Sequence, residues 1–87
     1  ERILVTHTHG DHSPGALPLA AATGAPVFGR RALHAEWQDA SFAPEREIEH
    51  GERLALADGV TLRALHTPGH ASNHLCYLLE EEKTLFT

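Results

Sequence analysis

Apolar residues fall into short runs along the chain, and these runs predict a mixed α/β domain. Residues 2–6 form a β-branched and aliphatic segment that is typical of a buried strand. Residues 16–23 are rich in Ala and Leu, which predicts a helix, and Gly24 is suited to cap its C-terminus. We expect Ser13 to cap the N-terminus of this helix, with Pro14 at the first helical position.

The middle of the chain carries weaker signals. Residues 26–29 suit a short strand, and residues 31–38 are long enough for one or two helical turns. Residues 39–51 show little apolar periodicity, so we expect a loop there.

The remaining part of the chain predicts a β-meander. Asp58 and Gly59 lie between two alternating segments, which is the strongest hairpin signal in the sequence. Residues 80–83 suit a polar turn between the last two strands. The expected strands are residues 53–57, 60–67, 73–79 and 84–87. Together with the earlier elements, this order predicts an α/β fold.

Composition narrows the class of protein. Of the 87 residues, 41% are hydrophobic and 22% are charged, which is typical of a folded domain. The net charge of −5 disfavours a nucleic-acid partner, and no apolar run reaches the roughly 20 residues of a membrane helix. Cys76 is the single cysteine, so an internal disulfide is excluded, and we expect it to be a buried apolar residue. We therefore expect a cytoplasmic protein without a membrane anchor.

Histidine changes this picture. The chain has eight histidines, and six of them fall into two short segments. These six are His7, His9, His12, His66, His70 and His74. Imidazole is the nitrogen ligand that zinc prefers at neutral pH, and it also binds iron, nickel and copper. The clustering therefore indicates a metal site.

The spacing within the first segment supports this interpretation. In an extended chain His7 and His9 point to the same face, about 6.5 Å apart, and Asp11 takes the next position on that face. His12 follows as the chain turns toward the helix, so it can approach a different point. We expect Gly10 to allow backbone angles that a Cβ would forbid.

A second loop supplies a further imidazole. Residues 67–69 (Thr-Pro-Gly) form a rigid turn that ends in His70. A ligand from a second loop is what a site needs to reach three protein ligands. We also expect Gly15 to let the helix after the first segment approach closely.

The sequence HTHGDH at residues 7–12 resembles the H-x-H-x-D-H motif of the metallo-β-lactamase superfamily, and TPGH at residues 67–70 resembles the family's next ligand motif. The pair is similar to that of the LACTB-like and glyoxalase-II-like branches. The resemblance covers nearly the whole chain. It implies that residues 1–87 are part of an αββα sandwich, a mixed sheet with flanking helices, that continues beyond the C-terminus and before the N-terminus.

The resemblance also implies residue roles. His7, His9 and His70 would bind a first zinc ion, and Asp11 and His12 would contribute to a second. Two ions about 3.5–4 Å apart would share a hydroxide and polarise the bond being attacked. Asp11 would also hydrogen-bond the attacking water. The family's bridging Asp and final His ligand would lie outside these 87 residues.

The implied activity is hydrolysis of a small thioester or ester. A LACTB-like endoribonuclease is the alternative, and it would need a basic groove supplied from outside this segment. A non-catalytic metal-binding fragment also remains open. A di-iron redox site is disfavoured because such relatives typically carry an acidic residue where this chain has His9. A small-molecule substrate is thus favoured over RNA, and the sequence does not indicate an oligomeric state.

Several other residues have less specific patterns. We expect His66, at the end of a strand, to have a structural role or to donate a hydrogen bond beneath the site. His74 could contact substrate or support the fold, and Trp37 could either cover the core or line a pocket. We expect His34 and His50 to be solvated.

Overall fold

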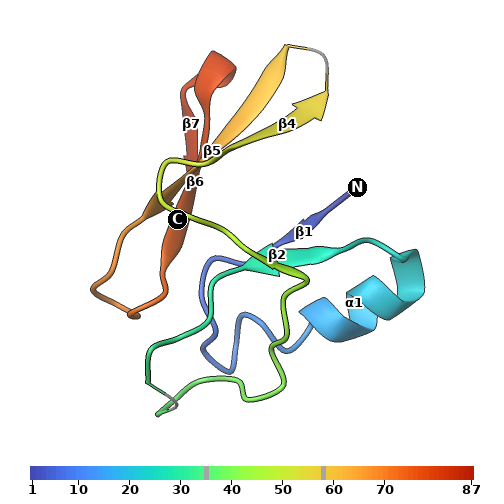
Figure 1. Cartoon of the computed structure of the whole chain (residues 1–87), viewed down its shortest axis with the longest axis vertical. Coiled ribbons are helices and arrows are strands. Elements are labelled where there is room, and N and C mark those ends of the chain that lie inside the picture. The colour runs from blue at the N-terminus through green and yellow to red at the C-terminus, as the bar shows by residue number, and fades with distance from the viewer. Residues whose placement is uncertain (35, 58) are drawn as a thin grey trace.

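The protein forms two β-sheets and a short helix in the computed structural model, which describes residues 1–34, 36–57 and 59–87 (Figure 1). The elements are, in order, β1 (Ile3–Leu4), α1 (Ala16–Thr23), β2 (Val27–Gly29), β3 (Arg46–Glu47), β4 (Arg53–Ala57), β5 (Val60–His66), β6 (Leu75–Leu79), the 3₁₀ turn η1 (Glu80–Glu82) and β7 (Thr84–Phe86). The α/β class with mixed strand directions, predicted from the sequence, is confirmed.

The first sheet is parallel and has the order β1-β2-β3. Helix α1 connects β1 to β2, because parallel neighbours need a crossover rather than a tight turn. Pairing extends past the two residues of β1, since Val5 N–H donates to Phe28 O at 3.0 Å. The predicted strand is therefore present, but only Val5 of residues 2–6 is buried, while Arg2 is exposed and the others are half-buried.

Strand β3 lies where the sequence predicts a loop, so that prediction is wrong at this point. Ile48 N–H donates to Gly29 O at 2.9 Å and extends the pairing of β3 with β2. Arg46 and Glu47 are both exposed, and a strand of two exposed residues has no apolar alternation to reveal it. The helical turns expected at residues 31–38 are also absent from the described residues of that segment, while Ala35 lies outside them.

Helix α1 has the predicted residues but a different start. Gly15 is its N-cap, and no side chain caps the first turn. Ser13 is buried instead and donates from Oγ to Asp39 Oδ2 at 2.7 Å. The prediction of a Ser13 cap with Pro14 at the first helical position is therefore wrong, because a long-range carboxylate takes the hydroxyl. The Gly24 cap is confirmed, with φ at +74°.

The second sheet is the antiparallel meander β4-β5-β6-β7, as the sequence predicts. Strand β5 ends at His66, and β6 begins at Leu75, so residues 67–74 form the loop between them. Gly59 has φ at +73°, which suits a hairpin turn, whereas Asp58 of the predicted Asp-Gly turn lies outside the described residues.

The two sheets are joined through β1 and β6. Tyr77 Oη donates to Val5 O at 2.7 Å, and Leu75 N–H donates to Thr6 O at 2.7 Å. Burial raises the pKa of Tyr77, which keeps this donor protonated. The apolar core between the sheets consists of Ile48, Leu54, Leu62, Ala64, Leu75 and Tyr77, with Leu4, Phe28 and Leu79 at its margin. The segment that leads from β1 into the histidine cluster is thereby fixed against the core.

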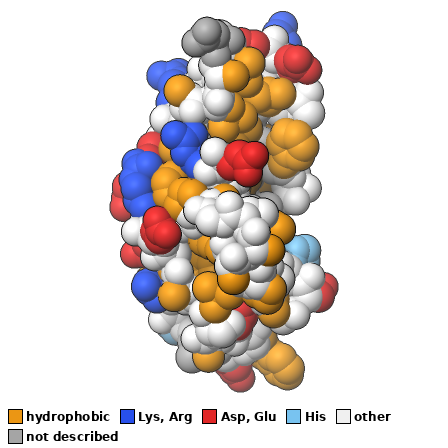
Figure 2. Space-filling model, turned by 90° about the vertical axis from the view of Figure 1, so that its right-hand side faces the viewer, with side chains coloured by type: hydrophobic (Ala, Val, Ile, Leu, Met, Phe, Trp, Pro, Cys, Tyr) orange, Lys and Arg blue, Asp and Glu red, His pale blue; other side chains and the backbone are white. Residues whose placement is uncertain are grey.

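A smaller core lies under α1. It contains Val5, Ala16, Val27 and Phe42. Gly29 is required there, since a Cβ at this position would lie 2.8 Å from Cζ of Phe42 and 3.4 Å from Cβ of Val5. Figure 2 shows that apolar side chains also reach the surface on one face, between charged ones. No helix of the described residues is long and apolar enough to cross a membrane.

Candidate metal centre

Three histidines from two loops converge at one point. His7 and His9 follow β1, and His70 comes from the loop between β5 and β6. One nitrogen of each lies within 4.8 Å of the others, and the ring centroids of the three pairs are 4.7–4.9 Å apart. The structure thus brings together the three residues expected to bind a first metal ion.

His7 is the most buried of the three, and its Nε2 is available to bind a cation. Its Nδ1 lies 3.0 Å from Thr6 Oγ1, whereas its Nε2 is buried and has no hydrogen-bond partner among the described residues. With the proton on Nδ1, His7 donates to Thr6 and keeps the Nε2 lone pair free. Burial, followed by the neighbouring imidazoles of His12, His74, His9 and His70, lowers the pKa of His7 to about 4. The ring is therefore neutral at physiological pH, as a metal ligand must be.

The two residues expected to serve a second ion are arranged more loosely. The His12 ring lies 4.0 Å from the His7 ring, centroid to centroid. His12 Nε2 and Asp11 Oδ2 are 3.7 Å apart, and the Asp11 side chain is 83% exposed. Both lie beside the three-histidine cluster, but neither belongs to its converging set.

A buried hydrogen-bond network holds the first histidine segment in place. Thr8 and Asn73 are almost fully buried, and Asn73 Nδ2 donates to Thr8 Oγ1 at 2.9 Å. The same amide donates to Arg30 O at 2.8 Å. Thr8 Oγ1 donates in turn to Gln38 Oε1, and Thr8 O accepts from Asp39 N–H at 2.7 Å. Sequence reasoning missed this network, because nothing local marks Thr8 or Asn73 as buried.

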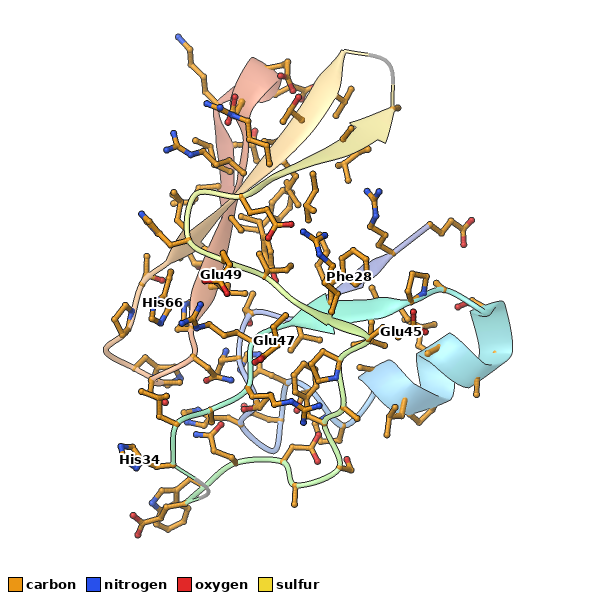
Figure 3. All side chains as sticks on the ribbon, viewed as in Figure 1. Phe28, His34, Glu45, Glu47, Glu49 and His66 are labelled. Atoms are coloured by element: carbon orange, nitrogen blue, oxygen red, sulfur yellow. The ribbon has the colours of Figure 1, made fainter. Side chains whose placement is uncertain are left out.

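The loop that carries His70 is held from beneath. His66 Nε2 lies 2.8 Å from Ser72 O, and His66 N–H donates to His50 Nδ1 at 3.0 Å. Thr67 N–H donates to His74 O at 2.9 Å and closes the loop. Figure 3 shows His66 at the base of this loop. The structural role expected for His66 matches these contacts, whereas His50 does more than contact solvent.

His74 lies at the cluster as a fifth imidazole. Its ring is 4.9 Å from that of His7 and 6.1 Å from that of His70, centroid to centroid. Thr67 Oγ1 lies 3.1 Å from its Nδ1. Burial and the imidazoles of His70, His12 and His9 lower its pKa. The sequence left its role open, and the geometry places it within the histidine cluster rather than on a separate surface.

The glycines of this region differ from expectation. A Cβ at Gly10 or Gly15 would meet no heavy atom within 4 Å, and neither residue has a positive φ. The expected need for glycine at these two positions is therefore wrong. The first turn is instead held by backbone bonds, since His12 N–H donates to His9 O at 3.0 Å.

An open pocket of about 460 Å³ lies in front of the cluster. It is lined by His9, Gly10, Asp11, Trp37 and His70. Of the two alternatives for Trp37, the structure thus favours lining a pocket over covering the core. Three converging imidazoles, a nearby carboxylate and the buried Nε2 of His7 together match the donor set that zinc prefers.

Comparison with known proteins agrees with this geometry. The family model described as the metallo-beta-lactamase superfamily matches residues 1–87. The chain belongs to the metallo-beta-lactamase superfamily. It is 41% identical over 85 residues to the lactamase-like protein aptB of Emericella nidulans, covering 98% of this chain and 25% of that protein. It is 42% identical over 87 residues to the lactamase-like protein vrtG of Penicillium aethiopicum, covering 100% of this chain and 26% of that protein.

A solved structure shares the fold of this superfamily member. A Cronobacter sakazakii metallo-beta-lactamase with a HARLDQ motif matches with a TM-score of 0.74 and 26% sequence identity, covering 88% of this chain and 36% of that one. The present chain thus spans about a quarter of the length of the curated relatives it matches. The expected metallo-β-lactamase sandwich is confirmed for this part of the fold.

Proposed function

We propose that the protein carrying this chain is a metal-dependent hydrolase that acts on a small thioester or ester. The observation that carries the proposal is the convergence of His7, His9 and His70 around the partnerless Nε2 of His7. Zinc, when bound there, would lower the pKa of a coordinated water and polarise the carbonyl of the substrate. Family membership supports this class of reaction.

Each residue has a distinct part in the proposal. His7, His9 and His70 hold the first ion, with His7 oriented by its hydrogen bond to Thr6. Asp11 and His12 contribute to a second ion, together with ligands from outside this chain. Asp11 also lines the pocket, where its carboxylate accepts a hydrogen bond from the attacking water and orients it.

Charge favours a small neutral substrate over RNA. The chain carries a net charge of −5, and RNA binding draws much of its affinity from Lys and Arg contacts to phosphates. The pocket before the cluster has one carboxylate and no Lys or Arg among its lining residues. Endoribonuclease activity would therefore depend on basic residues outside this chain.

Metal content and turnover test the proposal together. The full-length protein that carries this chain is purified without added metal and examined by mass spectrometry, then incubated with acyl thioesters, esters and a single-stranded RNA. We expect about two equivalents of zinc and cleavage of a thioester or ester. A His7→Ala/His9→Ala variant should lose both, because the ligands of the first ion are removed.

His34→Ala is the matched control, since His34 is exposed, lies at the edge of the molecule (Figure 3) and does not belong to the converging histidines. It should keep full metal content and activity. Cleavage of RNA but not of the esters would favour the endoribonuclease alternative over the hydrolysis of a thioester or ester. A folded protein that binds no metal, or one that binds zinc and cleaves nothing, would contradict the hydrolase proposal.

A further inference from the structure

Trp37 lies beside the histidine cluster with an exposed side chain and an unfavourable backbone conformation. It is the single tryptophan of the chain, and it is 83% exposed. Its φ of +64° lies in the left-handed region, which a bulky residue rarely adopts. The indole belongs to neither of the two apolar cores that the described residues form. Such a residue is retained where the surrounding structure holds it for function.

The backbone next to Trp37 is fixed to the metal-binding segment. Gln38 forms an isolated antiparallel bridge with His9, and Asp39 N–H donates to Thr8 O at 2.7 Å. Asp39 also accepts from Ser13 Oγ at 2.7 Å. The two residues after Trp37 therefore move with the histidine segment, which keeps the indole at the cluster.

The indole lines the same pocket as two of the metal-binding histidines. The pocket of about 460 Å³ lies within the size range of small-molecule sites and is formed by Trp37 with His9, Gly10, Asp11 and His70. An indole offers a flat apolar surface, and aromatic pairs gain energy beyond the area they bury. Among the described residues that line this pocket there is no Lys or Arg, so it offers no side-chain cation to an anionic acyl group.

We propose that Trp37 is a substrate-binding residue that selects thioesters or esters whose acyl group is aromatic. The proposal rests on the proposed hydrolase function. The acyl ring would stack on the indole, while its carbonyl reaches toward His9 and His70. A residue in this position discriminates between substrates through the acyl group and leaves the metal ligands unchanged.

Two variants separate stacking from mere bulk. In the full-length protein, Trp37→Leu keeps an apolar side chain without an aromatic face, whereas Trp37→Phe keeps the face. Leu33→Ala is the matched control, because Leu33 is 78% exposed in the same segment but does not line the pocket of the cluster. The ratio of kcat/KM for a benzoyl thioester to that for a butanoyl thioester with the same leaving group is measured for each.

We expect Trp37→Leu to lower this ratio roughly 3- to 10-fold, as the loss of one aromatic pair predicts. Trp37→Phe should retain most of it, Leu33→Ala should not change it, and zinc content should be the same in all four proteins. An unchanged ratio in Trp37→Leu would overturn the proposal. So would an equal loss of both activities, since that would indicate a structural role.

Binding is tested separately from turnover. The benzamide analogue, in which NH replaces the thioester sulfur, is first checked to stay intact with the zinc-loaded protein and is then titrated against it. The emission of Trp37 is taken as the difference between the wild type and Trp37→Phe. Quenching of this difference signal by the benzamide, but not by the butanamide, is expected even if the protein cleaves no thioester. Absence of quenching by the benzamide would overturn the role of Trp37, whatever the outcome of the hydrolase test.

Discussion

The two halves of the proposed metal centre differ in how well this chain positions their residues. The first half consists of His7, His9 and His70, whose nitrogens already converge, and His7 is only 3% exposed. The second half consists of Asp11 and His12, whose side chains are 83% and 46% exposed. The first half is held by the buried network beneath it, while the second is held by little more than its own turn.

This difference shows where preorganisation comes from. A ligand set binds tightly when its side chains are oriented before the ion arrives, and buried hydrogen bonds do this for the first half. Exposed side chains must be ordered during binding, which costs conformational entropy. The first half should therefore bind an ion with this chain's own residues, whereas the proposed second half would need further ligands.

Removing one ligand from each half gives the largest expected contrast. In the full-length protein, His70→Ala should lower the affinity for the tighter zinc equivalent by more than about 100-fold, since loss of residues that only support ligands already costs 10–100-fold. Asp11→Ala should leave that equivalent and weaken the other. Competition with a chelator, followed by metal analysis, measures both. An equal loss of both equivalents in the two variants would show that the halves are not independent.

Acid should lower the stability of the metal-free protein through His7, without any substitution. The pKa of His7 is lowered from 6.5 to about 4, so between these values the unfolded chain binds a proton that the folded, metal-free protein does not. The stability that follows from this shift is fully present above pH 6.5 and is lost as the pH falls toward 4. The slope is at most about 1.4 kcal/mol per pH unit.

Urea denaturation of the metal-free protein at pH 7, 6, 5 and 4.5 measures this slope. A His7→Gln variant cannot titrate at this position, so its stability should fall less over the same range. Equal slopes for the two proteins would mean that His7 is not the group responsible.

Some of this contrast could be predicted from the sequence. The HTHGDH and TPGH segments supplied the five ligand candidates, and the structure brings three of them, His7, His9 and His70, to one point. The apolar runs predicted the strands of the meander and helix α1, because these depend on residue type and local spacing. Features set by neighbours in the sequence were thus predictable.

Features that depend on residues far apart in the sequence were not predictable. Ser13 resembles a helix cap, but its hydroxyl bonds Asp39, which lies 26 residues away. Asn73 resembles a polar loop residue, yet it is buried against Thr8, which is 65 residues away. The exposed strand β3 exists because β2 offers it an edge. No local pattern records such long-range pairs, and they are what orient the first half.

The Asn73 amide provides a direct test of this long-range support. Asn73→Ala removes the donors to Thr8 and Arg30, and leaving such buried groups without partners costs about 1–3 kcal/mol. We expect zinc affinity of the first half to fall about 10-fold. Thr84→Ala is the control, since Thr84 is exposed in β7 and should change neither quantity. If Asn73→Ala lowers the stability but leaves the zinc affinity unchanged, the Asn73 amide stabilises the fold without orienting the zinc ligands.

Two glycines provide the smallest contrast. Gly29 lies in β2 against Val5 and Phe42 of the smaller core. A Cβ there would meet Phe42 Cζ at 2.8 Å, so Gly29→Ala should destabilise the fold by about 1 kcal/mol through overpacking. Gly10 lies within the metal-binding turn, where a Cβ meets nothing within 4 Å, so Gly10→Ala should change stability by less than about 0.5 kcal/mol. Thermal or urea denaturation with and without zinc measures both. If the effect at Gly10 exceeds that at Gly29 only when zinc is bound, the turn changes shape when it binds the ion. The first half would then be less preorganised than its buried contacts indicate.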